Sequence, residues 1–199
     1  MSPLHDRRRW DLLGLVLLLS WFCLLNGWQT TAVLLSAALL HEGAHWAALR
    51  LLGSGGVRLR LSPFGAVMET DGLRLSYAGE LAAVLAGPGV NLAAGALLAA
   101  AGEPWTAAAG AQVVLGLFNL LPVRPLDGGR ALTLAVSWAA GPRAGELAAA
   151  AVSSCAALAA AWGVTWVMVR TGGSLWLLPA AAGFAACAWR ELAGMRSFL

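Results

Sequence analysis

Charged side chains are scarce in this sequence: Asp, Glu, Lys and Arg together make up 12% of its 199 residues. A soluble domain usually carries about twice this share, so the scarcity excludes an ordinary soluble globule. The hydrophobic share of 59% also excludes disorder, which requires low hydrophobicity and high net charge. Apolar runs as dense as these indicate a polytopic membrane protein instead.

Lysine is absent, so arginine supplies all 13 basic residues, and the net charge is only +3. No basic cluster with interleaved aromatic residues is present, and we therefore expect no nucleic-acid partner. Cysteine is also rare: Cys23, Cys155 and Cys187 each lie singly inside an apolar run, without a CxxC spacing. We expect small buried residues at these positions rather than a disulfide or a metal site.

Six apolar runs come close to the length of about 17–25 residues that one membrane-spanning helix needs. They cover about residues 12–25, 31–52, 81–101, 105–121, 146–169 and 175–189. Three arginines precede the first run, as in a signal peptide, but no small-x-small cleavage site follows it. The sequence therefore predicts an all-α polytopic membrane protein with six transmembrane helices, the first of them uncleaved.

The arginines are divided very unequally between the two sides of this six-span arrangement. If the N-terminus lies in the cytosol, Arg170 alone falls on the outer side and the other arginines all fall on the inner side. An excess of arginine in cytosolic loops is the usual pattern of membrane proteins. We therefore expect both termini in the cytosol.

The connection after the second run carries a strand pattern. Residues 57–61 alternate apolar residues with arginine, Ser62 and Pro63 interrupt the alternation, and residues 64–69 resume it. Alternation with a period of two is typical of a β-strand with two different faces. We expect a small membrane-associated β-hairpin on the cytosolic side, and the alternative is a plain amphipathic loop.

The second apolar run contains His41-Glu42-Gly43-Ala44-His45, an HExxH motif. Two histidines four residues apart share one face of a helix and can bind one zinc ion, and Glu42 lies close enough to accept a proton from the attacking water. With three histidines in the chain, composition alone would produce this motif about once in a thousand such sequences. The alternative, a pair of histidines satisfied by neighbouring helices, leaves the third ionisable group of an apolar helix unexplained.

A catalytic zinc ion needs a third protein ligand and an open fourth position. Most acidic residues fall in loops or at helix ends, whereas Asp127 follows a proline-broken segment on the same membrane side as His45. Irregular backbone at membrane depth persists only where it lines protein or a wet cavity, and Gly128 and Gly129 allow close backbone approach. Asp127 is therefore the candidate third ligand. The alternative is that it caps a helix over residues 131–140.

Three motifs together make the sequence resemble the site-2 protease family of intramembrane zinc metalloproteases. They are HExxH in the second run, AGPGVN at residues 86–91 and NLLPVRPLDGG at residues 119–129. The resemblance extends over about residues 8–195 and is strongest to the sporulation branch, which processes pro-sigma-K. It implies one intramembrane metalloprotease domain over residues 1–199 in a bacterial cell membrane.

The resemblance also implies a role for individual residues. The zinc ligands of the family are matched by His41, His45 and Asp127, and its general base is matched by Glu42. Asn119 matches a motif asparagine near the active site that holds the substrate or an oxyanion. The alternative for Asn119 is a hydrogen bond between packed helices.

Two further features of the family have counterparts here. Asn91, in the GPxxN sequence, is expected to order the backbone of a turn. The hairpin near residues 57–70 resembles the membrane-associated ribbon of the family, on which an extended substrate can add as a further strand. The chain ends ten residues after Trp189, so we expect neither the CBS domain of many sporulation members nor a PDZ domain.

The function that the resemblance implies is zinc-dependent endoproteolysis of a membrane-tethered protein substrate in or near the lipid bilayer. In the sporulation branch the substrate is a pro-sigma factor, and inhibitory membrane partners are compatible with this setting. One alternative is a site-2 protease of another pathway, which cleaves an anti-sigma factor or signal-peptide remnants. A second alternative is a membrane scaffold or transporter that keeps a degenerate zinc site.

Overall fold

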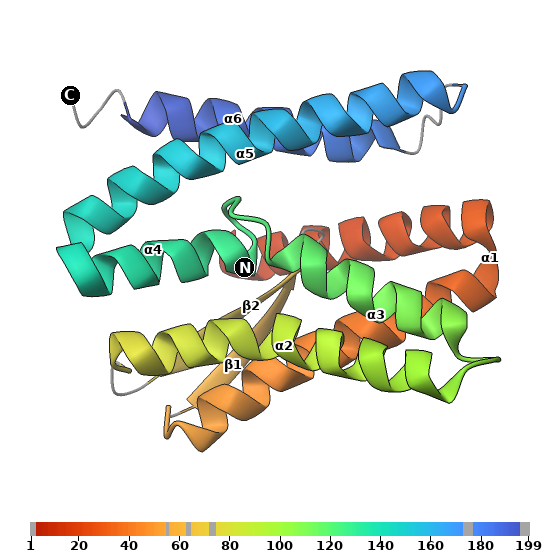
Figure 1. Cartoon of the computed structure of the whole chain (residues 1–199), viewed down its shortest axis with the longest axis horizontal. Coiled ribbons are helices and arrows are strands. Elements are labelled where there is room, and N and C mark those ends of the chain that lie inside the picture. The colour runs from red at the N-terminus through yellow and green to blue at the C-terminus, as the bar shows by residue number, and fades with distance from the viewer. Residues whose placement is uncertain (1–2, 55, 63–64, 72–74, 173–176, 196–199) are drawn as a thin grey trace. The chain divides into compact units, whose positions relative to one another are not determined.

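The computed structural model describes residues 3–54, 56–62, 65–71, 75–172 and 177–195. The helices and strands follow in the order α1 Pro3–Leu51, β1 Gly56–Ser62, β2 Gly65–Asp71, α2 Tyr77–Ala101, α3 Thr106–Asn119, α4 Asp127–Ala140, α5 Pro142–Arg170 and α6 Leu178–Met195 (Figure 1). The chain divides into two compact units, Met1–Leu117 and Phe118–Leu199. Each unit is described by itself.

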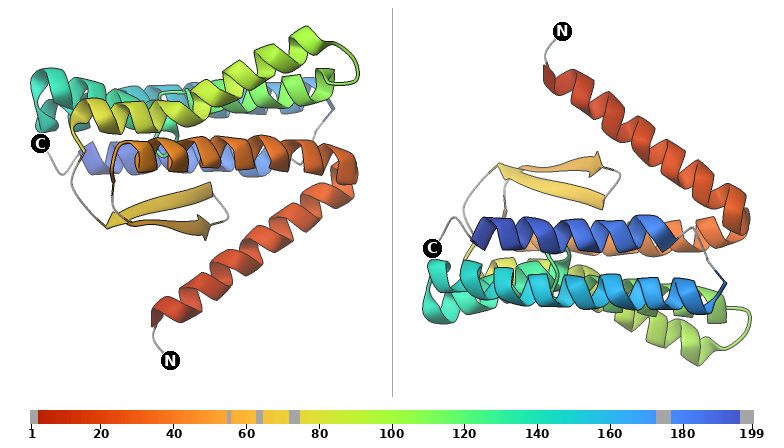
Figure 2. Two further views of the ribbon diagram at one scale, coloured as in Figure 1. Left: turned by 90° about the horizontal axis from the view of Figure 1, so that it is seen from below. Right: turned by 90° about the horizontal axis from the view of Figure 1, so that it is seen from above.

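In the first unit, α1 consists of two helical halves that meet at a sharp bend, clearly visible in Figure 2. Gly27 lies at the bend with φ 83° and ψ 160°, a backbone conformation that favours glycine. The helix is closed on both sides of the bend by side chains: the Asn26 amide donates to the Phe22 carbonyl, and the Thr31 hydroxyl donates to the Gly27 carbonyl. The sequence Asn26-Gly27 therefore separates the first two apolar runs with a single non-helical residue.

Helix α2 packs against α1, and small residues allow the close approach of its neighbours. Ser76 caps its N-terminus by accepting from the Gly79 N–H at 3.2 Å. A Cβ at Gly95 would lie 2.6 Å from Val113 Cγ2, so α2 and α3 touch where that glycine leaves room. This packing brings the middle of α2 alongside the second half of α1, where the HExxH motif lies.

The expected β-hairpin is present. Strands β1 and β2 pair antiparallel from Gly56 with Asp71 to Ser62 with Gly65 and form a two-stranded sheet. The ribbon follows directly after α1, and β1 contacts α1. The turn residues 63–64 and the side chains of residues 55–74 lie outside the described part of the chain.

In the second unit, α4, α5 and α6 follow one another as packed neighbours, and α5 and α6 lie side by side in Figure 1. The turn between α4 and α5 is very tight. Gly141 adopts φ 90°, Pro142 begins α5, and a Cβ at Gly145 would lie 1.9 Å from Ser137 Oγ. The buried apolar core of this unit is formed by Val123, Ala157, Phe184 and Ala188.

Among the described residues, three helices are long and apolar enough to cross a membrane: Val16–Leu51 of α1, α2 and α5. They indicate a multi-pass membrane protein, and many large apolar side chains on them are exposed. The six expected spans are not confirmed. The first two runs lie together in α1, and α3 with 14 residues is only about 21 Å long, less than the hydrocarbon thickness of about 30 Å.

Candidate metal centre

The two histidines of the HExxH motif lie side by side on the second half of α1. His41 is buried, with 5% of its surface exposed, and His45 is half-buried. Their rings meet edge to face with centroids 4.7 Å apart, and their Nε2 atoms are 3.1 Å apart. The spacing of four residues thus produces the side-by-side arrangement that the sequence predicts.

The Nδ1 atom of each ring has a partner on α2. His45 Nδ1 lies 2.8 Å from the Ala83 carbonyl, which can only accept, so Nδ1 carries the proton and donates. His41 Nδ1 lies 2.6 Å from Asn91 Oδ1. The Asn91 amide nitrogen donates to the Ala37 carbonyl at 3.2 Å and to Gln112 Oε1, so its oxygen is the atom that faces His41. His41 Nδ1 therefore also donates.

This protonation pattern decides what the pair of rings can do. When Nδ1 of a neutral imidazole carries the proton, Nε2 presents a lone pair. The two Nε2 atoms of His41 and His45 therefore point their lone pairs into one small space. Two nitrogens bound to one tetrahedral zinc ion at about 2.0–2.1 Å would lie about 3.3 Å apart, close to the observed 3.1 Å. The residues fit a metal ion, and their outer nitrogens are held as metal-binding histidines usually are.

Gly87 of α2 provides room for the two imidazole rings. A Cβ at this position would lie 2.3 Å from His45 Nε2 and 2.9 Å from His41 Cε1, much closer than any real Cβ contact. In contrast, a Cβ at Gly89 would meet nothing within 4 Å. The glycine at position 87 is therefore required by the site, whereas the glycine two residues later is not.

The remaining predicted site residues are distributed over both units. Glu42 is half-buried on α1, directly after His41. Asn119 is the last residue of α3 and is half-buried, and Asp127 is the first residue of α4 and is 8% exposed. Both belong to the second unit. The structure thus brings together His41 and His45 within the first unit, with partners from α2 and α3.

The capping alternative for Asp127 is wrong. Leu126 is the N-cap residue of α4, and its carbonyl accepts from the Arg130 N–H at 3.2 Å. Asp127 therefore lies within the first turn, where a carboxylate suits the positive end of the helix dipole, and the helix begins four residues earlier than expected. Gly128 and Gly129 permit this early start, because a Cβ on either would lie within 2.6 Å of the backbone of residues 120–123.

Two residues of the site were not predicted as such. Asn91 was expected to order a turn, but it lies in the middle of α2, fully buried, and contacts His41. Gln112 of α3 is 6% exposed and accepts from Asn91. A polar amide inside an apolar helix is costly unless it is satisfied, and this cost was the available signal for Gln112.

Comparisons with known proteins agree with this picture of the fold. Residues 96–161 match the model of Peptidase family M50, which is about a third of the chain and includes Asn119 and Asp127 but not the HExxH motif. No curated protein sequence matches the chain. The fold is similar to that of the Site-2 Protease from Methanocaldococcus jannaschii, with a TM-score of 0.62 and 22% sequence identity over 91% of this chain and 87% of that chain.

Proposed function

We propose that this protein is a zinc-dependent intramembrane endopeptidase that cleaves a membrane-tethered protein in or near the bilayer. The observation that carries the proposal is the pair of Nε2 atoms of His41 and His45, 3.1 Å apart, with each Nδ1 engaged by a separate acceptor. The Peptidase family M50 match and the site-2 protease fold support the same chemistry. The three long apolar helices provide the membrane setting.

The proposed metal site consists of His41, His45 and Asp127. Two imidazoles and one carboxylate form a donor set that could hold a metal ion, and hydrolytic zinc sites use these ligand types. Three protein ligands leave one position for water or substrate. When bound, zinc would polarise the scissile carbonyl and lower the pKa of the attacking water.

Glu42 is the proposed general base. It follows His41 on the same helix, about 100° further round, and its side chain is half-buried. Its carboxylate accepts a proton from the attacking water and later delivers that proton to the leaving amine. Asn119 is proposed to donate from its amide to the developing oxyanion, or to hold the substrate. A scaffold or transporter with a degenerate site would have no need of Glu42.

The hairpin is the proposed docking element for the substrate. A protease must bind its substrate in an extended conformation, and a strand edge offers main-chain hydrogen bonds to such a segment. In the two-stranded sheet each of β1 and β2 has one edge that its partner does not use. An extended substrate segment would add to one of these edges beside α1.

The finer assignment that we propose is a bacterial cell-membrane enzyme of regulated intramembrane proteolysis that processes a pro-sigma factor in sporulation. The arginine asymmetry places the inner loops and both termini in the cytosol, which favours a substrate approached from that side. A site-2 protease acting on an anti-sigma factor or signal-peptide remnants is the alternative. Cleavage tests with each tethered substrate distinguish the two, and inhibitory membrane partners are compatible with either.

The decisive experiment is Glu42→Gln in purified protein and in cells that co-express tethered pro-sigma-K. The variant removes the proton acceptor and keeps the ligands, so zinc content should stay at one ion per chain while cleavage falls by at least about 10²–10⁴-fold. Glu103→Gln makes the same chemical change at the exposed helix connection, where Glu103 accepts from Thr106, and should leave cleavage unchanged. Near-normal cleavage by Glu42→Gln would falsify the mechanism, and zinc-free wild-type protein would remove the metal site.

A further inference from the structure

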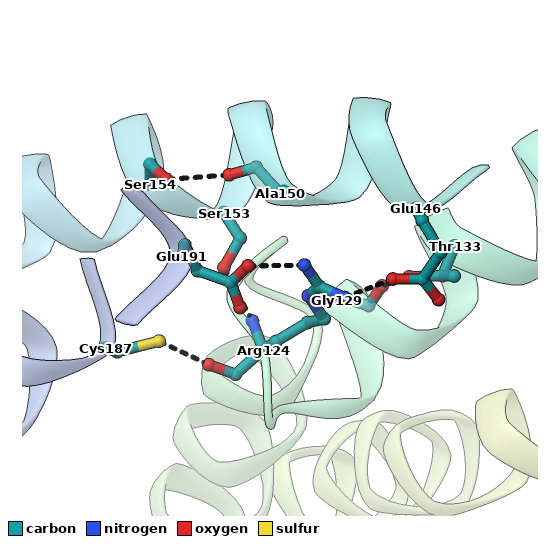
Figure 3. A network of polar contacts seen from close by, with 9 residues as sticks. All are labelled: Arg124, Gly129, Thr133, Glu146, Ala150, Ser153, Ser154, Cys187 and Glu191. Carbon is teal, nitrogen blue, oxygen red and sulfur yellow. Dashed lines mark hydrogen bonds and ion pairs between the residues drawn. The ribbon is translucent and has the colours of Figure 1, made fainter. Parts of the chain in front are cut away.

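Arg124, three residues before Asp127, is bound at four points (Figure 3). Its Nη1 donates to Glu146 Oε2 at 2.7 Å, and its Nη2 donates to Glu191 Oε2. Its backbone N–H donates to Ser153 Oγ at 2.9 Å. Its carbonyl accepts from the Cys187 thiol. One residue of a short loop thus has partners for its side chain and for both of its backbone polar groups.

The four partners come from two helices, and each helix contacts Arg124 twice. Glu146 and Ser153 lie on α5, whereas Cys187 and Glu191 lie on α6. Figure 3 shows the guanidinium between the two carboxylates, with the backbone of the loop held beneath it. Arg124 is therefore fixed to the packed α5–α6 pair in both position and orientation, which a single ion pair would not achieve.

The electrostatics favour a permanent clamp. The Arg124 side chain is 27% exposed, Glu191 is 13% exposed and Glu146 is 50% exposed. Burial by itself lowers the pKa of Arg124, but the hydrogen bonds and charges of Glu191 and Glu146 outweigh burial and raise that pKa above its ordinary value. The guanidinium therefore stays charged at any physiological pH. Glu191, the more buried partner, would lose most if the arginine were removed.

The fixed position of Arg124 is passed on to Asp127 through the backbone. Between the two residues, the Leu126 N–H donates to the Val123 carbonyl at 2.7 Å, so the loop closes a tight turn. Beyond Asp127, a Cβ at Gly129 would lie 2.7 Å from the Arg124 nitrogen. The first turn of α4 therefore rests directly on the clamped loop and cannot shift independently of it.

We propose that Arg124 is a positioning residue, which sets the place of the Asp127 carboxylate by clamping the loop to α5 and α6. The inference rests on the proposed function, because it assigns Asp127 the role of metal ligand. Arg124 itself touches neither metal nor substrate in this scheme. Its loss should weaken metal binding and turnover while leaving the affinity for substrate unchanged.

The test measures zinc affinity by chelator competition in detergent-solubilised full-length protein, together with kcat and KM for a tethered peptide substrate. Arg124→Met should bind zinc about 10–100-fold more weakly, as is usual when a residue that supports a metal ligand is lost. Its kcat should fall and its KM should stay within about twofold. Arg143→Met removes an exposed arginine at the start of α5 and serves as the matched control with unchanged values.

A second readout is independent of the metal. In a Cys23→Ala/Cys155→Ala background, alkylation of Cys187 reports whether its thiol is still held against the Arg124 carbonyl. Arg124→Met should speed alkylation at least about fivefold, because loss of the clamp frees the thiol for reagent. Glu146→Gln, which keeps the Glu191 partner, should have a smaller effect on both readouts, and it decides the matter if Arg124→Met fails to fold.

Wild-type zinc affinity in a folded Arg124→Met, or in Glu146→Gln when only that variant folds, overturns the positioning role. Weaker zinc binding with an unchanged Cys187 alkylation rate also overturns it, because the clamp would then be intact. Failure of the proposed function has a different signature: wild-type protein without zinc, or full zinc affinity in Asp127→Asn, removes the ligand on which this inference rests. The two failures are therefore told apart by the wild-type and Asp127 measurements.

Discussion

His41 Nδ1 and Asn91 Oδ1 lie 2.6 Å apart, and this contact fixes which nitrogen of His41 faces His45. The asparagine cannot turn its amide over without losing the Ala37 carbonyl and Gln112 Oε1 as acceptors. A buried amide with every polar atom engaged in this way is a rigid support. It keeps His41 in the tautomer that can bind a metal ion through Nε2.

Replacement of Asn91 tests this support. Asn91→Leu keeps a similar volume but removes the acceptor for His41 Nδ1, so zinc affinity should fall about 10–100-fold. Gln112→Leu removes only the group that orients Asn91, and its effect should be smaller. Chelator competition measures both, with Asn26→Leu on the exposed part of α1 as the control. Wild-type affinity in a folded Asn91→Leu protein would show that the contact does not matter for the metal.

Gly87→Ala should disable the metal centre without breaking the fold. The added Cβ would lie 2.3 Å from His45 Nε2, so one imidazole has to rotate out of its position. We expect the loss of most bound zinc and at least about a hundredfold loss of cleavage, since misplacement by about 1 Å can cost that much. Gly89→Ala, two residues further along α2, meets nothing and should retain both. Equal behaviour of the two variants would contradict the close fit at position 87.

Gly145→Ala should destabilise the second unit without any direct effect on the metal ligands. Its Cβ would lie 1.9 Å from Ser137 Oγ and 2.7 Å from the Thr133 carbonyl, so α4 and α5 must separate. Overpacking of this kind costs about 1–3 kcal/mol. Gly163→Ala on the same helix meets nothing within 4 Å and should be neutral or stabilising by up to about 1 kcal/mol. Thermal unfolding in detergent measures the pair, and an unfolding temperature for Gly145→Ala at or above that of Gly163→Ala would refute the prediction.

The orientation in the membrane is a separate prediction. Reporter fusions at residues 1 and 199 should both give a cytosolic signal, because Arg170 alone falls on the outer side of the six-span arrangement. Tryptophans beside Arg50 and Arg170 stack under these arginines at 5.3 Å, as residues at a membrane interface often do. An outer signal at either end would rule out the six-span arrangement.

The sequence predicted local features well where one spacing decides them. The HExxH spacing determines that His41 and His45 lie side by side, and the alternation in residues 57–69 determines the β-hairpin. It did not predict where α4 begins, because the early start depends on how closely Gly128 and Gly129 approach the preceding loop. Nor could it predict contacts between residues distant in the chain, such as those of Asn91 with His41, because no local pattern encodes them.

The number of spans was the least secure expectation, for a physical reason. Hydropathy counts apolar length and cannot tell a bend from a loop, so two runs separated by Asn26-Gly27 were assigned as separate spans. A short run such as that of α3 has the composition of a span but too little length. Arg124 was counted only as one charge of the inner side, because its role depends on carboxylates 22 and 67 residues away.

The bend at Gly27 also determines where a soluble protease could cut the first unit. At that end of the unit the connections are Gly27 itself and residues 102–105 between α2 and α3, which Figures 1 and 2 place beside each other. At the opposite end, residues 52–76 separate α1 from α2 and carry the ribbon. Limited digestion should therefore nick this unit first between α1 and α2, and the fragment ending near the ribbon should keep both halves of α1 joined.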